Sequence, residues 1–352
     1  MSDDSGLNAP PPSGLTYPFK MVPEPGTTIE VAPGVLWIRM KMPSRLNHIN
    51  LWLLDEGDGW TIVDTGLFNK DTQESWEKIF ENELNGKPIK RLVVTHLHPD
   101  HIGLAGWITR KFDIELWISR TDFLMCKMLV LDTGDDIPAA ALRFYREAGL
   151  PESALDVYRT RFGTFGRSIY KMPTQYRRIQ DGEVIDVGGR DWHVVVGRGH
   201  APEHACLYCP ELKVLISGDQ VLPRITSNVS VFPTEPDGNP LKEWMESLYM
   251  LKEKLPDDLL VLPAHNEPFY GLHRRLDDLI GGHETNLKDL YDLLDTRKRA
   301  VDVFPALFKR EITDEVMMMA TGESLAHLNY LLEEGQIARS QDPNGTIYYQ
   351  QI

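Results

Sequence analysis

The chain has 352 residues, of which 42% are hydrophobic, and a formal net charge of −15 at pH 7. That length and apolar content can bury a full core, so we expect one large domain with a smaller additional unit. The acidic balance argues against a nucleic-acid partner, because phosphate binding needs clustered cationic side chains. No apolar run approaches the roughly 20 residues of a membrane span, and residues 1–16 lack the pattern of a secretory signal. We therefore expect a cytoplasmic protein that binds neither nucleic acid nor membranes.

The chain reads as two sets of strands with helices between them. The first set predicts strands at residues 35–39, 49–54, 60–64 and 92–94, with a helix at 71–84. The second set predicts a helix at residues 241–254 and strands at 184–187, 192–196, 205–208, 214–217 and 259–262. Two half-sheets with helices outside them indicate an α/β fold, a four-layer αββα sandwich.

The domain boundaries are predicted from changes in this pattern. We expect a disordered Pro-rich tail over residues 1–20, a main domain over residues 21–270 and a C-terminal unit over residues 271–352. Residues 120–178, between the two half-sheets, are too long for a simple connection and predict an inserted helical lid, with helices at 123–131 and 139–147.

The C-terminal unit begins with a long amphipathic helix predicted at residues 272–294. Three short helices at residues 306–308, 314–320 and 324–334, followed by an Asn-Gly hairpin, resemble a winged helix. Residues 301–352 contain only three basic residues against eight acidic ones. We therefore expect this unit to serve packing or dimerisation rather than DNA binding, and we favour a homodimer.

A dense cluster of metal-ligand residues follows the predicted strand at 92–94. The segment Thr95-His96-Leu97-His98-Pro99-Asp100-His101 places three imidazoles and one carboxylate within six positions. Imidazole nitrogen and carboxylate oxygen are the usual non-thiolate ligands of zinc. A loop that leaves a strand can direct these side chains at two neighbouring points, so the segment predicts a site for two metals.

Further ligand candidates follow the later strands singly. His200, Asp219 and His265 each come after an apolar strand and beside Gly, Pro or Ala, where the backbone must turn. Any one of them alone is better read as a core histidine or a turn aspartate. Together with the first cluster, they indicate a single site.

This set of motifs resembles the metallo-β-lactamase fold superfamily over residues 47–265. The motifs that carry the resemblance are Asp64-Thr65-Gly66, His96-x-His98-x-Asp100-His101, Gly199-His200, Gly218-Asp219 and Pro263-Ala264-His265. The resemblance implies one metal held by His96, His98 and His200, a second held by Asp100, His101 and His265, and Asp219 bridging them. It places Asp64 behind a ligand as an orienting group. Asn266 and Ala264 depart from the Pro-Gly-His-Gly that hydrolases of this group often have.

The resemblance also implies the chemistry. Two Zn²⁺ ions, with iron or manganese as alternatives, would activate a bridging hydroxide that attacks a carbonyl carbon. Asp100 and Asp219 would be the catalytic carboxylates, with Asp100 passing a proton to the leaving group. The branch that fits is glyoxalase II-like or thioesterase-like, acting on a thioester or ester such as an acyl-coenzyme A or a hydroxyacylglutathione. Lactonase, ribonuclease and iron-dependent persulfide dioxygenase remain alternative functions, as does a regulator with a relic site.

The substrate prediction rests on residues 120–178, where ten Lys or Arg face seven Asp or Glu. Aromatic residues among these charges predict an apolar pocket with a cationic rim, suited to a small anionic substrate with an apolar acyl group. The substrate-binding candidates are Arg143, Tyr145, Arg146, Phe165 and Tyr170. The alternative is that the arginines form a solvated helix face and the aromatics its core.

Other His and Cys residues are assigned less specific roles. His204 is expected to be structural, with support of a ligand as the alternative, and His273 and His283 are expected to be ordinary helix residues. Cys206 and Cys209 could be a metal or redox pair, but the strand-like pattern favours buried thiols.

Overall fold

The computed structural model describes residues 13–43, 46–134 and 136–352. The chain divides into two compact units. Unit 1 consists of Met1–Thr133, Gly163–Ser227 and Leu251–Leu276, and unit 2 consists of Gly134–Phe162, Asn228–Met250 and Asp277–Ile352. Most of the predicted tail lies outside the described residues, but Thr16 pairs with Tyr270 in unit 1 through a backbone hydrogen bond of 3.1 Å. Within the described residues, none of the helices is long and apolar enough to span a membrane.

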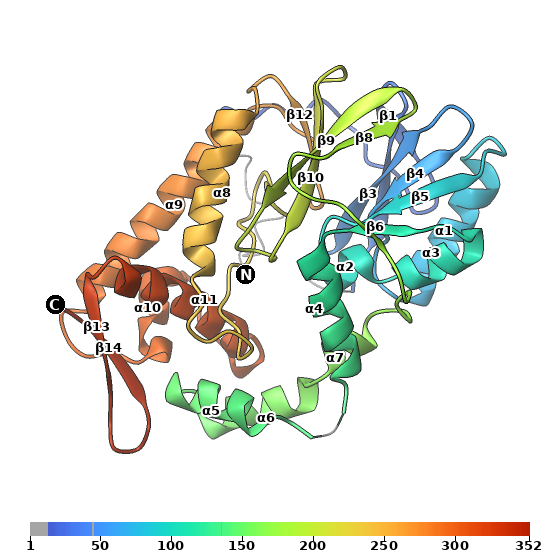
Figure 1. Ribbon diagram of the computed structural model, residues 1–352. Helices are drawn as coiled ribbons and strands as arrows, with labels where there is room; N and C mark the ends of the chain where they lie inside the picture. Colours follow the sequence, from blue (N-terminus) through green and yellow to red (C-terminus); the bar gives the residue numbers. More distant parts are fainter. Residues whose placement is uncertain (1–12, 44–45, 135) are drawn as a thin grey trace. The chain divides into compact units, whose positions relative to one another are not determined.

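Unit 1 contains a seven-stranded sheet whose strands follow chain order (Figure 1). Strands β1 to β4 are antiparallel, and the pairs from β4 to β7 are parallel. The strands are β1 (Ile29–Ala32), β2 (Val35–Lys41), β3 (His48–Asp55), β4 (Trp60–Val63), β5 (Ile89–Val93), β6 (Leu116–Ile118) and β7 (Arg177–Arg178).

A second, five-stranded sheet completes unit 1, in the order β12-β11-β10-β9-β8. Its strands are β8 (Val184–Val187), β9 (Arg190–Gly197), β10 (His204–Cys209), β11 (Val214–Gly218) and β12 (Leu260–Pro263). The strands predicted in both sheets are present, with ends that differ from the prediction by three residues or fewer. Cys206 and Cys209 lie on β10 as buried free thiols, as predicted.

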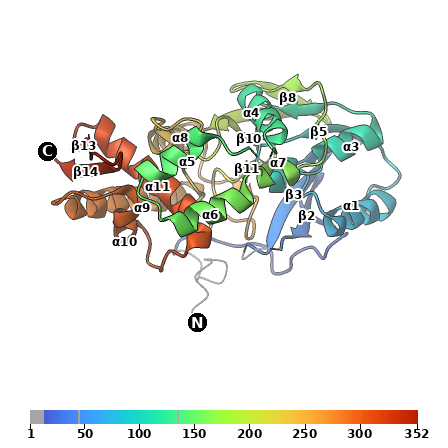
Figure 2. The same ribbon diagram turned by 90° about the horizontal axis from the view of Figure 1, so that it is seen from below.

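Alternation along the strands explains the layers of unit 1. On β2 and β3, Trp37 and Trp52 stack at 6.3 Å and belong to the core shared with the second sheet, which includes Trp192. Their neighbours Ile38 and Leu51 point to the opposite face. That face is covered by helices α1 (Lys70–Asn82), α3 (Ala105–Phe112) and α4 (Arg120–Leu131), and Figures 1 and 2 show α1 and α3 beside it. The predicted α/β fold class is confirmed.

The segment predicted as one lid, residues 120–178, is divided between the units. Helices α4 and α7 (Thr164–Arg167) belong to unit 1, whereas α5 (Ala139–Glu147) and α6 (Glu152–Arg161) belong to unit 2. The sequence interval alone could not reveal this division, because it depends on which core each helix joins.

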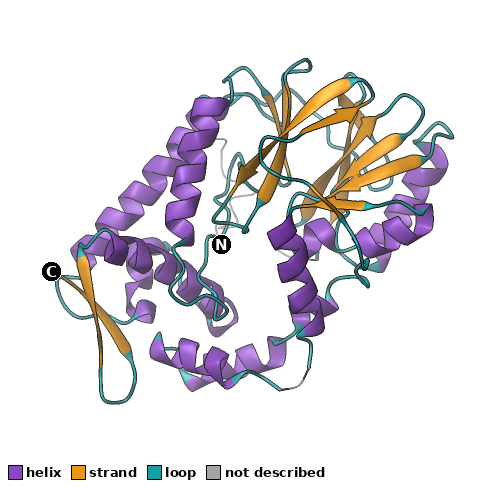
Figure 3. Ribbon diagram, viewed as in Figure 1, coloured by secondary structure: helices purple, strands orange, loops and turns teal. Residues whose placement is uncertain are grey.

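Unit 2 is mainly helical and ends in a β-hairpin (Figure 3). Helices α8 (Pro240–Lys254) and α9 (Leu272–Leu293) contain residues of both units. The remaining elements are η1 (Ala300–Val303), α10 (Phe304–Leu307), α11 (Asp314–Glu333), β13 (Ile337–Gln341) and β14 (Ile347–Gln351).

The two short helices predicted at residues 314–320 and 324–334 are wrong, because α11 is one continuous helix. Gly322, which falls in the interval between the two predicted helices, lies in the middle of it. A Cβ at Gly322 would lie 2.9 Å from both Ser230 Cβ and the Val231 carbonyl oxygen. The glycine therefore permits close packing, and this contact outweighs its cost of about 1 kcal/mol in a helix interior.

Candidate metal centre

The predicted ligands lie where strands of unit 1 end. His96 and His98 follow β5, and Pro99 opens the short helix α2 (Pro99–Ile102), which carries Asp100 and His101. Proline suits this first helical position because it has no N–H to leave unsatisfied. His200 follows β9, Asp219 follows β11, and His265 follows β12. Segments that directly follow strand ends, including the short helix α2, thus supply every candidate.

The structure brings these residues together in two groups. The ligand atoms of His96, His98, His200 and Asp219 all lie within 4.8 Å of one another, and those of Asp100, His101 and His265 do the same. In the first group, His96 Nε2 is 2.9 Å from His98 Nδ1, and His200 Nε2 is 3.2 Å from Asp219 Oδ2. In the second, His265 Nε2 is 3.5 Å from Asp100 Oδ2.

Asp219 reaches both groups. Its Oδ2 lies 3.2 Å from His200 Nε2 of the first group and 3.5 Å from His101 Nε2 of the second, and its Oδ1 lies 3.3 Å from His265 Nε2 of the second. One carboxylate therefore contacts histidines that the resemblance assigns to different metals.

The donor set fits metal ions. Burial holds the pKa of His96 well below its usual value and lowers that of His98 to about 3, so both rings are neutral and have a lone pair to donate. Although it is buried, His101 Nε2 has no hydrogen-bond partner among the described residues. The same holds for Asp219 Oδ1. Such atoms are costly to bury unless something binds them.

The carboxylates of the site favour positive charge at its centre. Burial alone would lower the pKa of His101, but Asp64, Asp219 and Asp100 together raise it well above its usual value. Burial would likewise raise the pKa of Asp219, yet His265 and His101 hold it well below its usual range. A divalent cation bound among these carboxylates would supply the positive charge that a proton on His101 otherwise supplies.

Asp64 orients His101. Its Oδ2 lies 2.8 Å from His101 Nδ1, and its Oδ1 accepts a 2.8 Å hydrogen bond from the Thr95 backbone N–H. The Thr95 hydroxyl also donates to Asp64 Oδ2 at 2.9 Å. These bonds fix the imidazole so that its Nε2 faces Asp219, the arrangement that supporting carboxylates commonly give to metal-binding histidines.

His204 lies against the bridging carboxylate rather than within either ligand group. Its Nε2 accepts a 3.0 Å hydrogen bond from the Asp219 backbone N–H, which requires a neutral ring. Burial holds the pKa of His204 well below its usual value. A Cβ at Gly218 would lie only 2.5 Å from the same Nε2 atom, so this glycine lets the histidine approach. His204 therefore supports the backbone of Asp219.

His48 supports His265, a role that the sequence did not reveal. The His48 carbonyl oxygen lies 2.8 Å from His265 Nδ1, and His48 Nε2 accepts a 2.8 Å hydrogen bond from the Asn266 N–H. Asn266 has φ of 68°, and asparagine is among the few non-glycine residues that adopt this left-handed conformation readily. The tight position of this turn is thus Asn266, while Ala264 is simply buried.

The substrate-binding candidates are divided between the two units. Tyr170 lies in unit 1, where its N–H donates to the Gly103 carbonyl at 2.8 Å, just after α2, and its ring meets Phe68 at 5.2 Å. Phe165, on α7, packs partly buried against the helix-side core of the same unit.

The other three candidates lie on α5 in unit 2. Tyr145 is buried against Tyr158, with ring centroids 4.9 Å apart. Arg143 and Arg146 are exposed, and Arg146 lies 3.6 Å from Glu152. The packing of Tyr145 agrees with the alternative prediction, in which the aromatic residues form the core between helices.

Comparison with known proteins identifies the class to which this fold and site belong. Residues 45–265 match the family model of the metallo-beta-lactamase superfamily, and residues 287–352 match the metallo-beta-lactamase-like C-terminal domain. The chain therefore belongs to the metallo-beta-lactamase superfamily, as its motifs predicted. It is a metallo-hydrolase with a His and Asp metal-binding site.

Three relatives illustrate the similarity. A beta-lactamase domain protein from Burkholderia ambifaria has a crystal structure that matches with a TM-score of 0.89 and 40% identity, over 96% of this chain and 98% of that one. A probable metallo-hydrolase from Bacillus subtilis is 23% identical over 90% of this chain and 97% of its own length. A human acyl-coenzyme A thioesterase is 29% identical over 53% of this chain and 63% of its own.

Proposed function

We propose that this protein is a dinuclear zinc hydrolase that cleaves a thioester, or an ester, of an apolar acyl group. The observation that carries the proposal is the position of Asp219, whose two carboxylate oxygens contact histidines of both ligand groups. Asp219 belongs to the first ligand group and also contacts two histidines of the second, so one carboxylate is in reach of both ions. The similarity to an acyl-coenzyme A thioesterase supports the choice of bond.

The ligand groups divide the binding of two ions between them. His96, His98 and His200 would hold one ion, Asp100, His101 and His265 the other, and Asp219 would bind both. When bound, such ions supply an activated water and polarise the substrate carbonyl. Asp64, His204 and His48 keep the ligands in place through the hydrogen bonds described above.

The charge state of Asp100 favours a thioester over an ester. Burial would raise its pKa, but His101 and His265 lower it to about 2, so Asp100 is ionised at neutral pH. A bound cation would lower that pKa further. Asp100 is therefore a poor acid for a leaving group, which argues against the proton transfer first assigned to it. A thiolate leaves without being protonated first, because a thiol has a pKa of about 8.5.

Exposed apolar residues of unit 1 can accommodate an acyl chain. On α4, Leu124, Met128 and Leu131 are 56%, 45% and 79% exposed, at positions that share one side of the helix. Helix α2 carries Asp100 and His101. The ring pair of Phe68 and Tyr170 lies beside the loop that follows this helix. Exposed apolar surface of this kind commonly marks a binding region.

Metal analysis and a substrate panel test the proposal. Protein purified without added metal is expected to contain about two zinc ions per chain, and one iron per chain would instead favour the persulfide dioxygenase alternative. Acyl-coenzyme A and hydroxyacylglutathione should then be compared with lactones, phosphodiesters and RNA. We expect kcat/KM for a thioester to exceed that for every other class at least tenfold, a difference of about 1.4 kcal/mol in transition-state stabilisation. A preference for a lactone or for RNA would contradict the proposed function.

A further inference from the structure

We propose that Asp122, on the first turn of α4, is a positioning residue that sets the spacing of the first ligand group. Its carboxylate joins the loop of His96 and His98 to the loop of His200, although it touches none of these rings in the described structure. The inference rests on the proposed metal-dependent function and adds a residue that neither the motifs nor the ligand groups include.

The two oxygens of Asp122 are used by two different loops. Oδ1 accepts a 2.9 Å hydrogen bond from the backbone N–H of Leu97, the residue between His96 and His98. Oδ2 accepts a 2.9 Å hydrogen bond from the backbone N–H of Glu203, three residues after His200. One rigid side chain therefore fixes the distance between the two segments that supply the histidines of this group.

The carboxylate itself is held firmly. Asp122 is fully buried, and the Ser119 hydroxyl, which caps α4, donates to Asp122 Oδ2 at 2.9 Å. Ser119 Oγ in turn accepts a hydrogen bond from the Asp122 N–H. A second tie runs from the Thr121 N–H to Glu203 Oε2 at 2.9 Å. Contacts at the start of its own helix thus fix the rotamer of Asp122, independently of the two loops.

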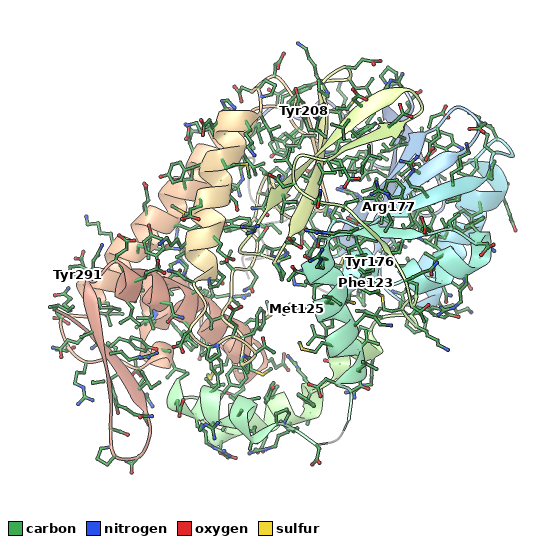
Figure 4. All side chains as sticks on the ribbon, viewed as in Figure 1. Phe123, Met125, Tyr176, Arg177, Tyr208 and Tyr291 are labelled. Carbon is green, nitrogen blue, oxygen red and sulfur yellow. The ribbon has the colours of Figure 1, made fainter. Side chains whose placement is uncertain are left out.

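Packing anchors the same helix in unit 1. Phe123, next to Asp122, stacks on Tyr176 with ring centroids 4.0 Å apart, and Figure 4 shows the two labelled side by side. Cys126, one turn further, is also buried. The helix cannot shift without losing these contacts, so it provides a fixed reference for both loops.

The chemistry of the position calls for a carboxylate. Two backbone N–H groups and a hydroxyl point at the side chain, so both of its oxygens must accept. Asparagine could offer one oxygen, but its NH₂ group would face a second donor. Burial raises the pKa of Asp122 to about 6, which is the cost of placing a charge here, and the three donors offset part of it.

Asp64 provides a natural contrast. It bonds directly to His101, in the second ligand group, and to Thr95. Asp64 reaches the first group only indirectly, because the Thr95 hydroxyl lies 3.0 Å from His96 Nδ1, whereas Asp122 bonds to both loops that supply the first group. If Asp122 is a positioning residue, variants at the two aspartates should weaken the binding of different ions.

The experiment measures zinc binding to the apoprotein by stepwise calorimetric titration for Asp122→Asn, Asp122→Ala and Asp64→Asn. Asp132→Asn serves as the matched control, because Asp132 is exposed at the other end of α4. Hydrogen exchange at the Leu97 and Glu203 amides of the apoprotein gives a readout that is independent of activity. Thermal melting reports the fold.

We expect Asp122→Asn to weaken one zinc-binding step 10- to 100-fold and to leave the other within about threefold. Asp64→Asn should weaken the other step, and Asp132→Asn neither. Amide exchange at Leu97 and Glu203 should accelerate in Asp122→Asn while cooperative melting persists. If Asp122→Ala fails to fold, Asp122→Asn decides the question.

Unchanged zinc affinity in folded Asp122→Asn would overturn the proposal. So would an equal loss at both steps, or weakening of the same step by Asp122→Asn and Asp64→Asn, since these would mean a general structural role. The outcome is separable from that of the proposed function. A protein that binds two zinc ions but cleaves no thioester disproves the function and leaves the role of Asp122 to the titration.

Discussion

Both units of the molecule bury histidines close together, but only in unit 1 do neighbouring carboxylates raise the pKa of some of them. In unit 2, His283 Nδ1 of α9 lies 3.3 Å from His327 Nε2 of α11, and both side chains are buried. Burial lowers the pKa of His283 to about 3 and that of His327 to about 4. Burial also raises the pKa of nearby Glu323 to about 7, with Arg310 as its opposing charge.

In unit 1 carboxylates lie among the histidines. Asp64, Asp100 and Asp219 lie within 4 Å of His101 and raise its pKa. Among the described residues, no carboxylate makes such a contact with His283 or His327. Burial alone therefore leaves the histidine pair of unit 2 neutral. Carboxylates that stay ionised make a histidine cluster a site for cations.

The sharpest test of this contrast is a matched pair of substitutions. His98→Ala should lower turnover of the preferred thioester at least 1,000-fold and remove one zinc ion, with melting of the apoprotein little changed, because the ring is a proposed ligand rather than part of the hydrophobic core. His327→Gln should leave turnover within about threefold. Steady-state kinetics and metal analysis measure both, and equal losses of turnover would contradict the distinction between the clusters.

Metal removal should destabilise only the carboxylate-rich cluster. With free zinc at about 1,000 times its Kd, binding adds about 4 kcal/mol to the stability of the folded site. Chelation should therefore lower the unfolding temperature of the wild type, and His98→Ala should show a smaller drop. His327→Gln should respond to the chelator as the wild type does. A chelator-insensitive wild type would exclude resident metal.

The pair in unit 2 predicts a pH-dependent stability. Between about pH 4.5 and 6.5 the unfolded chain would protonate His283 and His327, whereas their depressed pKa values keep them neutral when folded. Glu323 acts in the opposite sense, because its raised pKa lets the folded state hold one extra proton. In this pH range the unfolded state therefore binds two protons at these residues and the folded state binds one. The free energy of unfolding falls as the pH falls, because the unfolded state binds more protons.

Each net proton changes the free energy of unfolding by about 1.4 kcal/mol per pH unit. His327→Gln should reduce the slope of stability against pH between pH 5 and 6 by about that amount, as measured by urea denaturation. His273→Gln is a suitable comparison, since His273 is a half-buried helix residue whose Nε2 lies 2.7 Å from the Leu255 carbonyl. The same slope in His327→Gln and the wild type would disprove the neutral pair.

The smallest expected effect concerns the cationic rim proposed for α5. The double charge reversal Arg143→Glu and Arg146→Glu should raise KM about three- to tenfold for an acyl-coenzyme A, with kcat and neutral esters little affected, because exposed charges contribute about 1 kcal/mol or less. Kinetics at low and high salt measure the difference. Equal effects on anionic and neutral substrates would mean that these arginines in unit 2 only solvate a helix face.

Local sequence was sufficient for much of the fold and for the ligand candidates. Alternating apolar residues located the strands of both sheets, and the ligands could be found because each follows a strand end beside a turn residue. The helical character of the α11 segment was also readable, but its continuity through Gly322, which packs against Ser230 and Val231, was not.

The supporting residues could be recognised only in part. Asp64 carried a motif signal, and Ser119-x-x-Asp122 has the form of a capping sequence, so a helix start at that point could have been predicted. The hydrogen bonds from two distant loops to the Asp122 carboxylate could not have been predicted. The support that His48 gives to His265 could not have been predicted either. Those contacts join residues 25 to 217 positions apart in the chain.

The sequence by itself determined the strands, the loops that follow them and the residue types able to bind metal, because strand periodicity and turn chemistry act over a few neighbouring positions. Only the tertiary structure decided the rest. It joined seven ligand candidates into two groups with Asp219 between them, divided residues 120–178 between two units, and placed Asp122 under both ligand loops. These outcomes depend on which surfaces pack together in three dimensions, and no local pattern encodes that choice.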